Sequence, residues 1–238
     1  MPEKSVSVLL IDAGNTRCKW QLRSAGQVLA ADAAVYSELP EHWPDAEQII
    51  VACVAGRPDL QARLQQRYGA RLQWLSEPLA DYPQFRHCYP QPQRLGVDRW
   101  LAMLGARTHS QDNVLVVDAG TALTIDLMNA DNHHEGGFIV PGLELAQQAL
   151  FNNTGRVRPF ADEQEQAALA PGRDTLSCVS AGVRRQLQAL VMSVVQDYPD
   201  YRLFISGGDG HWLAQQLGVA SYPHLIFEGM ESLCAGYF

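Results

Sequence analysis

The sequence predicts an α/β fold composed of two similar halves, and three observations support this prediction. First, an apolar run ends in Asp-Ala-Gly-Asn-Thr at residues 12–16, and a second apolar run ends in Asp-Ala-Gly-Thr at residues 118–121. Second, each copy is followed by further strand patterns and then by helical patterns. Third, 238 residues divide into two halves of ordinary domain size. We therefore expect one half at 1–108 and the other at 109–238.

The first half is predicted to be a meander of strands followed by alternating helices and strands. Apolar or alternating patterns predict strands at 5–11, 18–22, 28–35, 49–54 and 72–75. Leu60 and Leu64 lie at helical spacing after Pro58, so we expect a helix at 58–68. The proline-rich segment 76–94 predicts a loop, and a helix follows from Asp98 onward.

The second half repeats this order. We expect strands at 113–118, 123–128, 138–140 and 203–205, and helices at 143–150, 177–196, 211–217 and 230–235. The polar segment 129–135 contains His133 and His134 beside acidic residues, and we interpret it as an exposed hairpin tip rather than a metal cluster. Glycines on both sides of 138–140 indicate a close approach of the backbone to another group.

Composition limits the classes of partner. Hydrophobic residues make up 47% of the chain and charged residues 18%, as in globular proteins. The formal charge of −8 argues against nonspecific attraction to nucleic acid or to anionic membranes, so we expect small-molecule partners. No apolar run approaches the roughly 18 residues of a membrane span, and the N-terminus lacks the character of a signal peptide. The five cysteines are scattered, which favours reduced thiols in the cytoplasm.

The two glycine turns have the residue types of a phosphate site. Asp12 and Asp118 each end a buried strand and precede a glycine, so a hard anionic ligand lies beside backbone N–H groups. Two such turns facing each other would form a cleft for a nucleoside triphosphate and its metal. The alternative is a pair of ordinary hairpin turns, which the duplication at half-chain spacing disfavours. Neither turn carries the G-K-[ST] of a P-loop, which argues against a P-loop NTPase.

Asp98 and Arg99 open the helix that follows the proline-rich segment. An aspartate there would be held by backbone donors, and the neighbouring arginine could bind a carboxylate through two hydrogen bonds. The alternative is an N-cap aspartate followed by a surface arginine, which helix statistics alone favour. The pattern leaves both open.

Five motifs together resemble the type III pantothenate kinase family, also called the CoaX or Bvg accessory factor family. They are Asp12-Ala13-Gly14-Asn15-Thr16, Gly96-Val97-Asp98-Arg99, Asp118-Ala119-Gly120-Thr121, the run at 136–142 and Ser206-Gly207-Gly208. All five stand in the family's order. The resemblance implies a duplicated ribonuclease-H-like fold, as in the superfamily of actin, hexokinase and acetate kinase, with a nucleotide cleft between the halves. Ser206 departs from the threonine common in the family but keeps the hydroxyl, and residues 153–156 depart from the usual run.

The resemblance also implies roles for single residues. It implies ATP binding by Asp12, Ala13, Gly14, Asn15, Thr16, Arg17, Cys18, Lys19 and Thr121. It implies a pantothenate pocket formed by Tyr89, Gly96, Val97, Asp98, Arg99 and Thr175. Within these sets Asp98 would be the general base, Arg99 would bind the substrate carboxylate and Asp12 would work with Mg²⁺. Asp118 would bind a monovalent cation, K⁺ or NH₄⁺, which adds positive charge where a P-loop lysine is missing.

We therefore expect an ATP-dependent kinase that converts pantothenate to 4′-phosphopantothenate, the first step of coenzyme A biosynthesis. One alternative is a non-enzymatic transcriptional accessory factor on the same fold, which the charge of −8 and the three retained aspartates disfavour. Another is a kinase of the same superfamily that acts on a sugar or on acetate. The motif at residues 96–99 distinguishes a pantothenate kinase from these enzymes.

A homodimer with the pantothenate pockets at or near its interface is also expected, because the resemblance implies dimers. The apolar stripe of the helix at 177–196 is wider than one core-facing side needs, which favours the same conclusion. The alternative is that the whole stripe packs inside one subunit.

Overall fold

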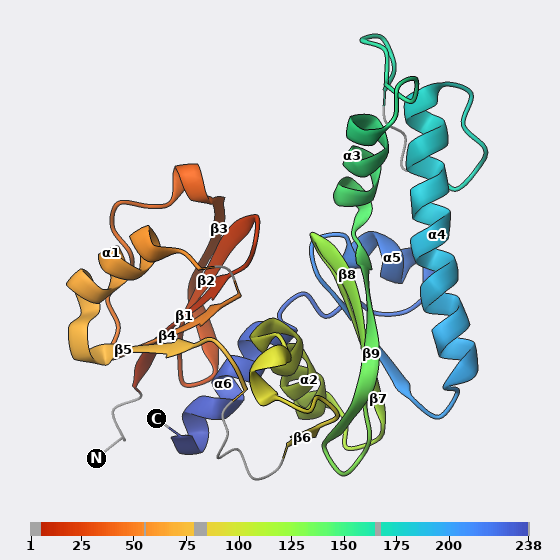
Figure 1. Ribbon diagram of the computed structural model, residues 1–238. Coiled ribbons are helices and arrows are strands. Elements are labelled where there is room, and N and C mark those ends of the chain that lie inside the picture. Colours follow the sequence, from red (N-terminus) through yellow and green to blue (C-terminus); the bar gives the residue numbers. More distant parts are fainter. Residues whose placement is uncertain (1–5, 55, 79–84, 165–167, 238) are drawn as a thin grey trace. The chain divides into compact units, whose positions relative to one another are not determined.

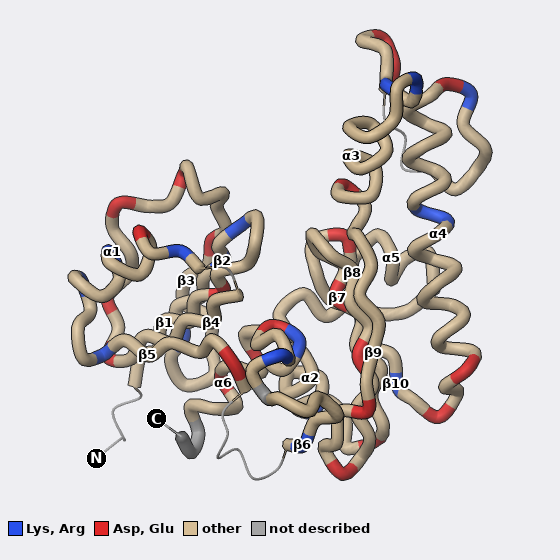
Figure 2. Tube along the Cα trace, viewed as in Figure 1, with Lys and Arg blue, Asp and Glu red and all other residues tan. Residues whose placement is uncertain are grey.

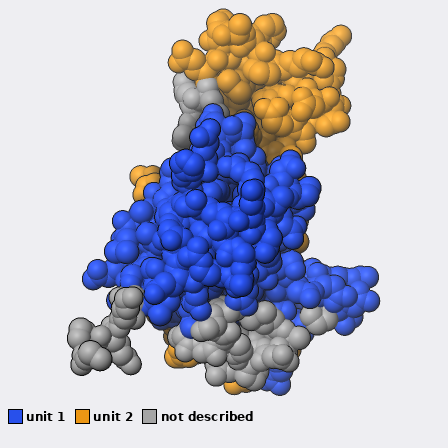
Figure 3. All heavy atoms as spheres, turned by 90° about the vertical axis from the view of Figure 1, so that its left-hand side faces the viewer, with its two compact units in different colours: residues 1–109, 224–238 blue, residues 110–223 orange. Residues whose placement is uncertain are grey.

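A computed structural model of the chain describes residues 6–54, 56–78, 85–164 and 168–237 (Figure 1). It forms two compact units, one of residues 1–109 with 224–238 and the other of residues 110–223 (Figure 3). The C-terminal segment 224–238 thus belongs to unit 1, whereas the division predicted from the repeat assigns it to the half 109–238. That division stays a prediction about the repeat.

Unit 1 contains a mixed sheet in the order β3-β2-β1-β4-β5. The strands are β1 (Ser7–Ala13), β2 (Arg17–Ser24), β3 (Gln27–Val35), β4 (Gln48–Cys53) and β5 (Leu72–Leu75). The first three form an antiparallel meander, and β4 pairs in parallel with both β1 and β5. The five strands predicted for this half are therefore confirmed.

Both faces of the central strand β1 are buried, which explains its continuous apolar run. Leu9 and Ile11 point into a core shared with Leu60 and Leu64 of helix α1 (Pro58–Tyr68). The opposite face of the sheet packs against two helices, with α6 (Leu225–Tyr237) against β1 and α2 (Val97–His109) against β4. The range 1–109 also contains short elements outside this sheet: the 3-10 turns η1 (Tyr36–Glu38), η2 (Gly69–Arg71) and η3 (Pro92–Arg94), and the strand β6 (Arg86–His87). The last two interrupt the predicted loop at 76–94.

Helices α2 and α6 cross with their backbones in close contact. A Cβ atom on Gly105 would lie 2.0 Å from the carbonyl oxygen of Leu225, and a Cβ on Gly229 would lie 2.0 Å from that of Leu101. Each helix therefore presents a glycine to the backbone of the other, and no larger residue fits at either position.

This crossing predicts opposite effects for two Gly→Ala substitutions. Gly229→Ala should lower the free energy of unfolding by about 1–3 kcal/mol or more, because the methyl group overpacks the contact. Gly182→Ala lies in a helix of unit 2 where nothing is within 4 Å of the new Cβ. It should raise that free energy by about 0.5–1 kcal/mol through helix propensity. Urea unfolding of both variants measures the difference, and equal stabilities would contradict the close crossing.

Buried polar side chains join β2 to α6. Arg23 is 7% exposed, donates from Nε to Gln21 Oε1 at 2.8 Å and forms an ion pair with Glu231 of α6. Gln21 Nε2 lies 3.1 Å from Nδ1 of His224, just before α6. These bonds satisfy polar groups that would otherwise be costly to bury, and so they fix the position of α6 on the sheet.

Unit 2 repeats the meander of unit 1. Its strands β7 (Val114–Ala119), β8 (Ala122–Met128) and β9 (His133–Pro141) are antiparallel, and β10 (Arg202–Ser206) pairs in parallel with β7. Its helices are α3 (Leu143–Asn153), α4 (Thr175–Asp197) and α5 (Gly210–Leu217). A meander followed by a parallel strand beside its first strand thus occurs in both units, which confirms the predicted plan of two similar halves.

One expectation about the β8–β9 hairpin is wrong. His134 was expected at an exposed tip, but its side chain is fully buried, with Nε2 2.8 Å from Oδ1 of Asp126. The tip lies earlier, where Asn129 accepts backbone hydrogen bonds from Asp131 and His133. An irregularity after Leu127 changes the pairing register, which a polar sequence pattern does not reveal. Within the described ranges, no group of three or more His, Cys, Asp or Glu side chains is arranged to hold a metal ion.

The apolar stripe of α4 packs inside unit 2. Five of its residues are buried in the core of this unit: Val179, Val183, Leu187, Val191 and Val194. Leu190 and Val195 pack partly buried against the same core. The stripe therefore gives no argument for a dimer, because the strands and helix α5 already cover it. None of the described helices is long and apolar enough to cross a membrane.

Candidate active site

Asp12 and Asp118 occupy equivalent places in the two sheets. Each is the next-to-last residue of the first strand of its unit, and each lies between an antiparallel and a parallel neighbour. Asp12 is 7% exposed, and Asp118 is half-buried. In both units a carboxylate therefore stands at the carboxyl end of a central strand, where open α/β sheets bind their ligands.

The first glycine turn joins β1 to β2, and side chains from other parts of unit 1 donate hydrogen bonds to its backbone. Its own closing bond runs from the Gly14 N–H to the Arg17 carbonyl at 3.1 Å. In addition, the Tyr36 hydroxyl donates to the Gly14 carbonyl at 2.5 Å, and Arg57 Nη2 donates to the Asn15 carbonyl at 2.8 Å. Sequence reasoning missed Tyr36 and Arg57, because neither belongs to a motif and both are distant along the chain.

The side chains around this turn differ in exposure. Asn15, Thr16 and Arg17 are exposed, as a phosphate-binding role requires. Cys18 lies in the core of unit 1, and burial, followed by the Asp12 carboxylate, raises the pKa of its thiol to about 12. Cys18 is therefore a neutral thiol at physiological pH, and its predicted part in nucleotide binding is restricted to its backbone. Lys19 is half-buried and pairs with Asp12 across the β1–β2 ladder.

The hydrogen bond that closes the second glycine turn spans one residue fewer than the one that closes the first. The Gly120 N–H donates to the Ala122 carbonyl at 3.0 Å, which leaves Thr121 exposed at the tip. Gly142, at the end of β9, donates its N–H to the Thr121 carbonyl at 2.9 Å. A Cβ on Gly142 would lie 2.0 Å from the Gly120 carbonyl oxygen. The close backbone approach expected around 138–140 is thus an approach to this turn.

A third glycine turn, after β10, closes over Asp118. Gly207 has φ of +93°, and a Cβ there would lie 2.5 Å from Asp118 Oδ1 and 2.4 Å from the Ala119 carbonyl oxygen. The Asp209 N–H donates to the same Ala119 carbonyl at 2.9 Å. Both the dihedral angle and the space therefore require glycine beside this carboxylate.

The Gly96–Arg99 motif begins helix α2. Asp98 lies in the first helical turn, where its Oδ1 accepts a hydrogen bond from the Arg99 N–H at 2.8 Å. A Cβ on Gly96 would lie 2.5 Å from the same oxygen, so glycine makes room for the carboxylate. Arg99 is 6% exposed and donates from Nη1 to the Tyr89 hydroxyl at 2.9 Å. The alternative of an N-cap aspartate and a surface arginine is therefore wrong.

Thr175 is the first residue of α4. The preceding Asp174 caps the helix by accepting from the Ser177 N–H at 2.7 Å, and the Ser177 bonds lower the pKa of Asp174. Glu163 accepts from the N–H groups of Thr175 and Leu176 at 3.4 and 2.9 Å. The backbone at Thr175 is thereby fixed, and its side chain is half-buried.

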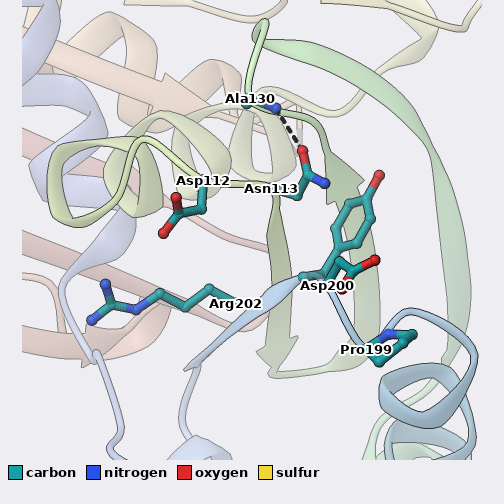
Figure 4. A pocket seen from close by; sticks show the side chains of 7 residues that line it. Asp112, Asn113, Ala130, Pro199, Asp200 and Arg202 are labelled. Carbon is teal, nitrogen blue, oxygen red and sulfur yellow. Dashed lines mark hydrogen bonds between the residues drawn. The ribbon is translucent and has the colours of Figure 1, made fainter.

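A depression of about 480 Å³ lies on unit 2, away from the glycine turns of this unit; Figure 4 shows the side chains that line it. It is lined by Asp112, Asn113, Ala130, Pro199, Asp200, Tyr201 and Arg202. These residues adjoin the starts of the parallel strands β7 and β10, whereas Asp118 and Ser206 lie at the ends of the same strands. The depression thus lies at the amino ends of β7 and β10, whereas the two glycine turns of unit 2 lie at the carboxyl ends of these strands.

A sequence profile and curated relatives both point to one family. A sequence profile described as type III pantothenate kinase matches residues 8–197, which include Asp12, Asp98, Asp118 and Thr175. A type III pantothenate kinase of Marinobacter nauticus is 33% identical over 96% of this chain and 98% of its own. One of Pseudomonas fluorescens is 34% identical over 95% of this chain and 98% of its own.

Solved structures share the fold. A protein of Campylobacter jejuni described as a Baf family transcriptional activator has a TM-score of 0.67 and 25% identity, covering 95% of this chain and 97% of that one. A Sinorhizobium meliloti protein described as a 2-dehydro-3-deoxygalactonokinase has a TM-score of 0.61 and 14% identity, covering 97% of each chain. The second likeness concerns the fold alone.

Proposed function

Because the chain belongs to the type III pantothenate kinase family, and so phosphorylates pantothenate in coenzyme A biosynthesis, we propose which of its residues carry the reaction. The observation that carries the proposal is the start of α2, where a buried arginine and a half-buried aspartate stand side by side. A carboxylate-binding group next to a proton acceptor suits a substrate with a carboxylate and a primary hydroxyl.

Arg99 is proposed to bind the pantothenate carboxylate. Its Nη1 is oriented by the Tyr89 hydroxyl, and its guanidinium carbon lies 5.9 Å from the centre of the Tyr89 ring. A guanidinium held in this way can form two parallel hydrogen bonds to a carboxylate. Thr175 is proposed to contact pantothenate, on the resemblance to the family.

Asp98 is proposed to accept the proton of the pantothenate hydroxyl as that oxygen attacks the γ-phosphorus of ATP, while the bond from the γ-phosphorus to the bridging oxygen breaks and ADP leaves with that oxygen. Phosphoryl transfer needs an oriented nucleophile and neutralised phosphate charge more than covalent participation by the protein. The Arg99 N–H bonded to Asp98 Oδ1 holds the carboxylate in place at 2.8 Å.

The glycine turns are proposed to bind the ATP phosphates. Asn15, Thr16 and Thr121 are exposed at the turn tips and supply N–H and hydroxyl donors. Asp12 suits Mg²⁺, which takes one or two carboxylates besides phosphate oxygens and water. Asp118, packed under Gly207 beside the Ala119 carbonyl, offers oxygen ligands that suit K⁺ or NH₄⁺. When bound, the two cations neutralise phosphate charge.

We also propose a cytoplasmic homodimer, on the resemblance to the family, and light scattering measures its mass.

The alternative of a transcriptional accessory factor remains disfavoured. The net charge is −8, and Figure 2 shows basic residues distributed among acidic ones along the trace. A chain with this net charge has no general electrostatic attraction for nucleic acid.

Arg99→Lys tests the proposed substrate contact. Lysine keeps the charge but cannot form two parallel bonds, so KM for pantothenate should rise about 10- to 100-fold, while KM for ATP changes little. Steady-state assays with each substrate varied give both values. Assays of the wild-type enzyme with sugars and with acetate are the specificity control, and turnover of these in preference to pantothenate would refute the assignment.

A further inference from the structure

The tip of the first glycine turn is held by two side chains outside the known motifs. The carbonyl of Gly14 accepts from the Tyr36 hydroxyl at 2.5 Å, and the carbonyl of Asn15 accepts from Arg57 Nη2 at 2.8 Å. Tyr36 begins η1, and Arg57 immediately precedes helix α1. We call Tyr36 and Arg57 the loop clamp.

Because peptide groups are planar, the hydrogen bonds of the loop clamp to two carbonyls also fix the N–H groups on the other side of the turn. In a trans peptide the carbonyl and the next N–H point in opposite directions within one plane. Fixing the Gly14 carbonyl therefore fixes the direction of the Asn15 N–H, and fixing the Asn15 carbonyl fixes that of the Thr16 N–H. Both N–H groups then point away from the loop clamp. Hydrogen bonds to the carbonyls also polarise these peptides, which strengthens their N–H groups as donors.

The loop clamp is itself well positioned. The guanidinium carbon of Arg57 lies 3.8 Å from the centre of the Tyr36 ring, a close cation–π contact. Burial, followed by the nearby Cys18, raises the pKa of Tyr36 to about 12, so its hydroxyl keeps its proton and remains a donor.

The guanidinium of Arg57 is not bound directly by an acidic side chain in the described ranges. No carboxylate there forms an ion pair with Arg57, and its Nε is buried without a hydrogen-bond partner among those residues. A guanidinium beside a turn that binds phosphates adds favourable potential where this fold has no P-loop lysine.

We propose that Arg57 and Tyr36 are positioning residues for ATP: they orient the Asn15 and Thr16 N–H groups toward the phosphates, and Arg57 supplies positive charge beside them. This inference rests on the proposed assignment of the first glycine turn to ATP. It does not depend on which alcohol accepts the phosphoryl group.

A second pair in unit 1 has the same chemistry without a phosphate motif. Arg67 Nη2 donates to the Trp43 carbonyl at 2.6 Å, and the Tyr68 hydroxyl donates to the Pro44 carbonyl at 2.6 Å. The Arg67 guanidinium carbon lies 5.3 Å from the centre of the Tyr68 ring. This pair supports a loop in the same way, so it provides matched control variants for a purely structural role.

The experiment compares Arg57→Gln with Arg67→Gln. For each variant, calorimetric titration with MgADP gives the nucleotide affinity, steady-state assays give KM for ATP and for pantothenate, and thermal melting gives stability. Arg57→Gln should weaken MgADP binding and raise KM for ATP by about 10- to 100-fold, with KM for pantothenate within about twofold of wild type. Arg67→Gln should lower the melting temperature without changing nucleotide binding.

Two further variants keep the test informative if Arg57→Gln folds poorly. Arg57→Lys retains the charge but loses the planar guanidinium that lies over the Tyr36 ring, so it should recover part of the MgADP affinity. Tyr36→Phe keeps the ring and loses only the bond to Gly14, so it should weaken binding by less than Arg57→Gln.

Nucleotide affinity within about twofold of wild type in Arg57→Gln would overturn the proposal, since a lost charge-assisted hydrogen bond costs more than that. An equal loss in Arg67→Gln would also overturn it. If wild-type protein bound MgADP but did not phosphorylate pantothenate, the proposed function would fail, while the MgADP titrations would still decide the role of the loop clamp.

Discussion

Asp98→Asn is expected to lower kcat for pantothenate phosphorylation by about 10²-fold or more. The reason is specific to the proton. Asparagine keeps an oxygen that can accept the Arg99 N–H, so the start of α2 is preserved, but it cannot accept the hydroxyl proton. KM for ATP and the affinity for MgADP should change little, because no phosphate contact is assigned to Asp98. Steady-state kinetics and calorimetry measure both quantities.

Asp59→Asn is the matched control for this substitution. Asp59 is the second residue of α1, as Asp98 is of α2, so both variants remove one negative charge from the first turn of a helix in unit 1. Any effect through the helix dipole is thereby shared. Asp59→Asn should keep the wild-type kcat. If Asp98→Asn did the same, Asp98 would not be the general base.

Asp118→Asn is expected to abolish activation by potassium or ammonium and to lower kcat by about 10²- to 10³-fold, the range found when a group that stabilises transition-state charge is removed. Asparagine preserves the shape that fits beneath Gly207 and removes only the charge that would hold the cation. The wild-type enzyme should be active in potassium and nearly inactive when sodium replaces it at constant ionic strength. Initial rates measured at increasing potassium concentrations compare the potassium response of the wild-type enzyme with that of Asp118→Asn.

Asp112→Asn controls for the loss of a charge near the same strand. Asp112 precedes β7 and lines the depression at the opposite edge of the sheet, so its replacement should leave the potassium response intact. Full activity of Asp118→Asn in a buffer without potassium or ammonium would remove the monovalent cation from the mechanism.

The parts of the fold that were predictable are those that local patterns encode. Asp12 and Asp118 were recognisable because each follows a short apolar run and precedes a glycine, and both features lie within a few residues of the carboxylate. The strands of both meanders were predicted for the same reason. The start of α2 was placed correctly, but the burial of Arg99 depends on Tyr89, which periodicity does not connect to it.

The parts that were not predictable depend on contacts between distant residues. The burial of His134 results from the β8–β9 register and from Asp126, although its neighbours in sequence are polar. The apolar stripe of α4 indicates which face is buried but not what covers it. Tyr36 and Arg57 reach the first glycine turn only through the folded sheet, so no spacing rule identifies them.

The assignment of α6 to unit 1 has a consequence for synthesis on the ribosome. Residues 110–223 are contiguous, so unit 2 is complete in sequence before α6 is translated. Unit 1 starts first but lacks the helix that covers one face of its sheet, together with the partners of Arg23 and Gly105, until the segment 224–238 emerges. The usual order, in which the N-terminal domain folds first, is therefore expected to be reversed. Nascent chains that end before α6 would expose the apolar face of α2, which makes them candidates for chaperone binding.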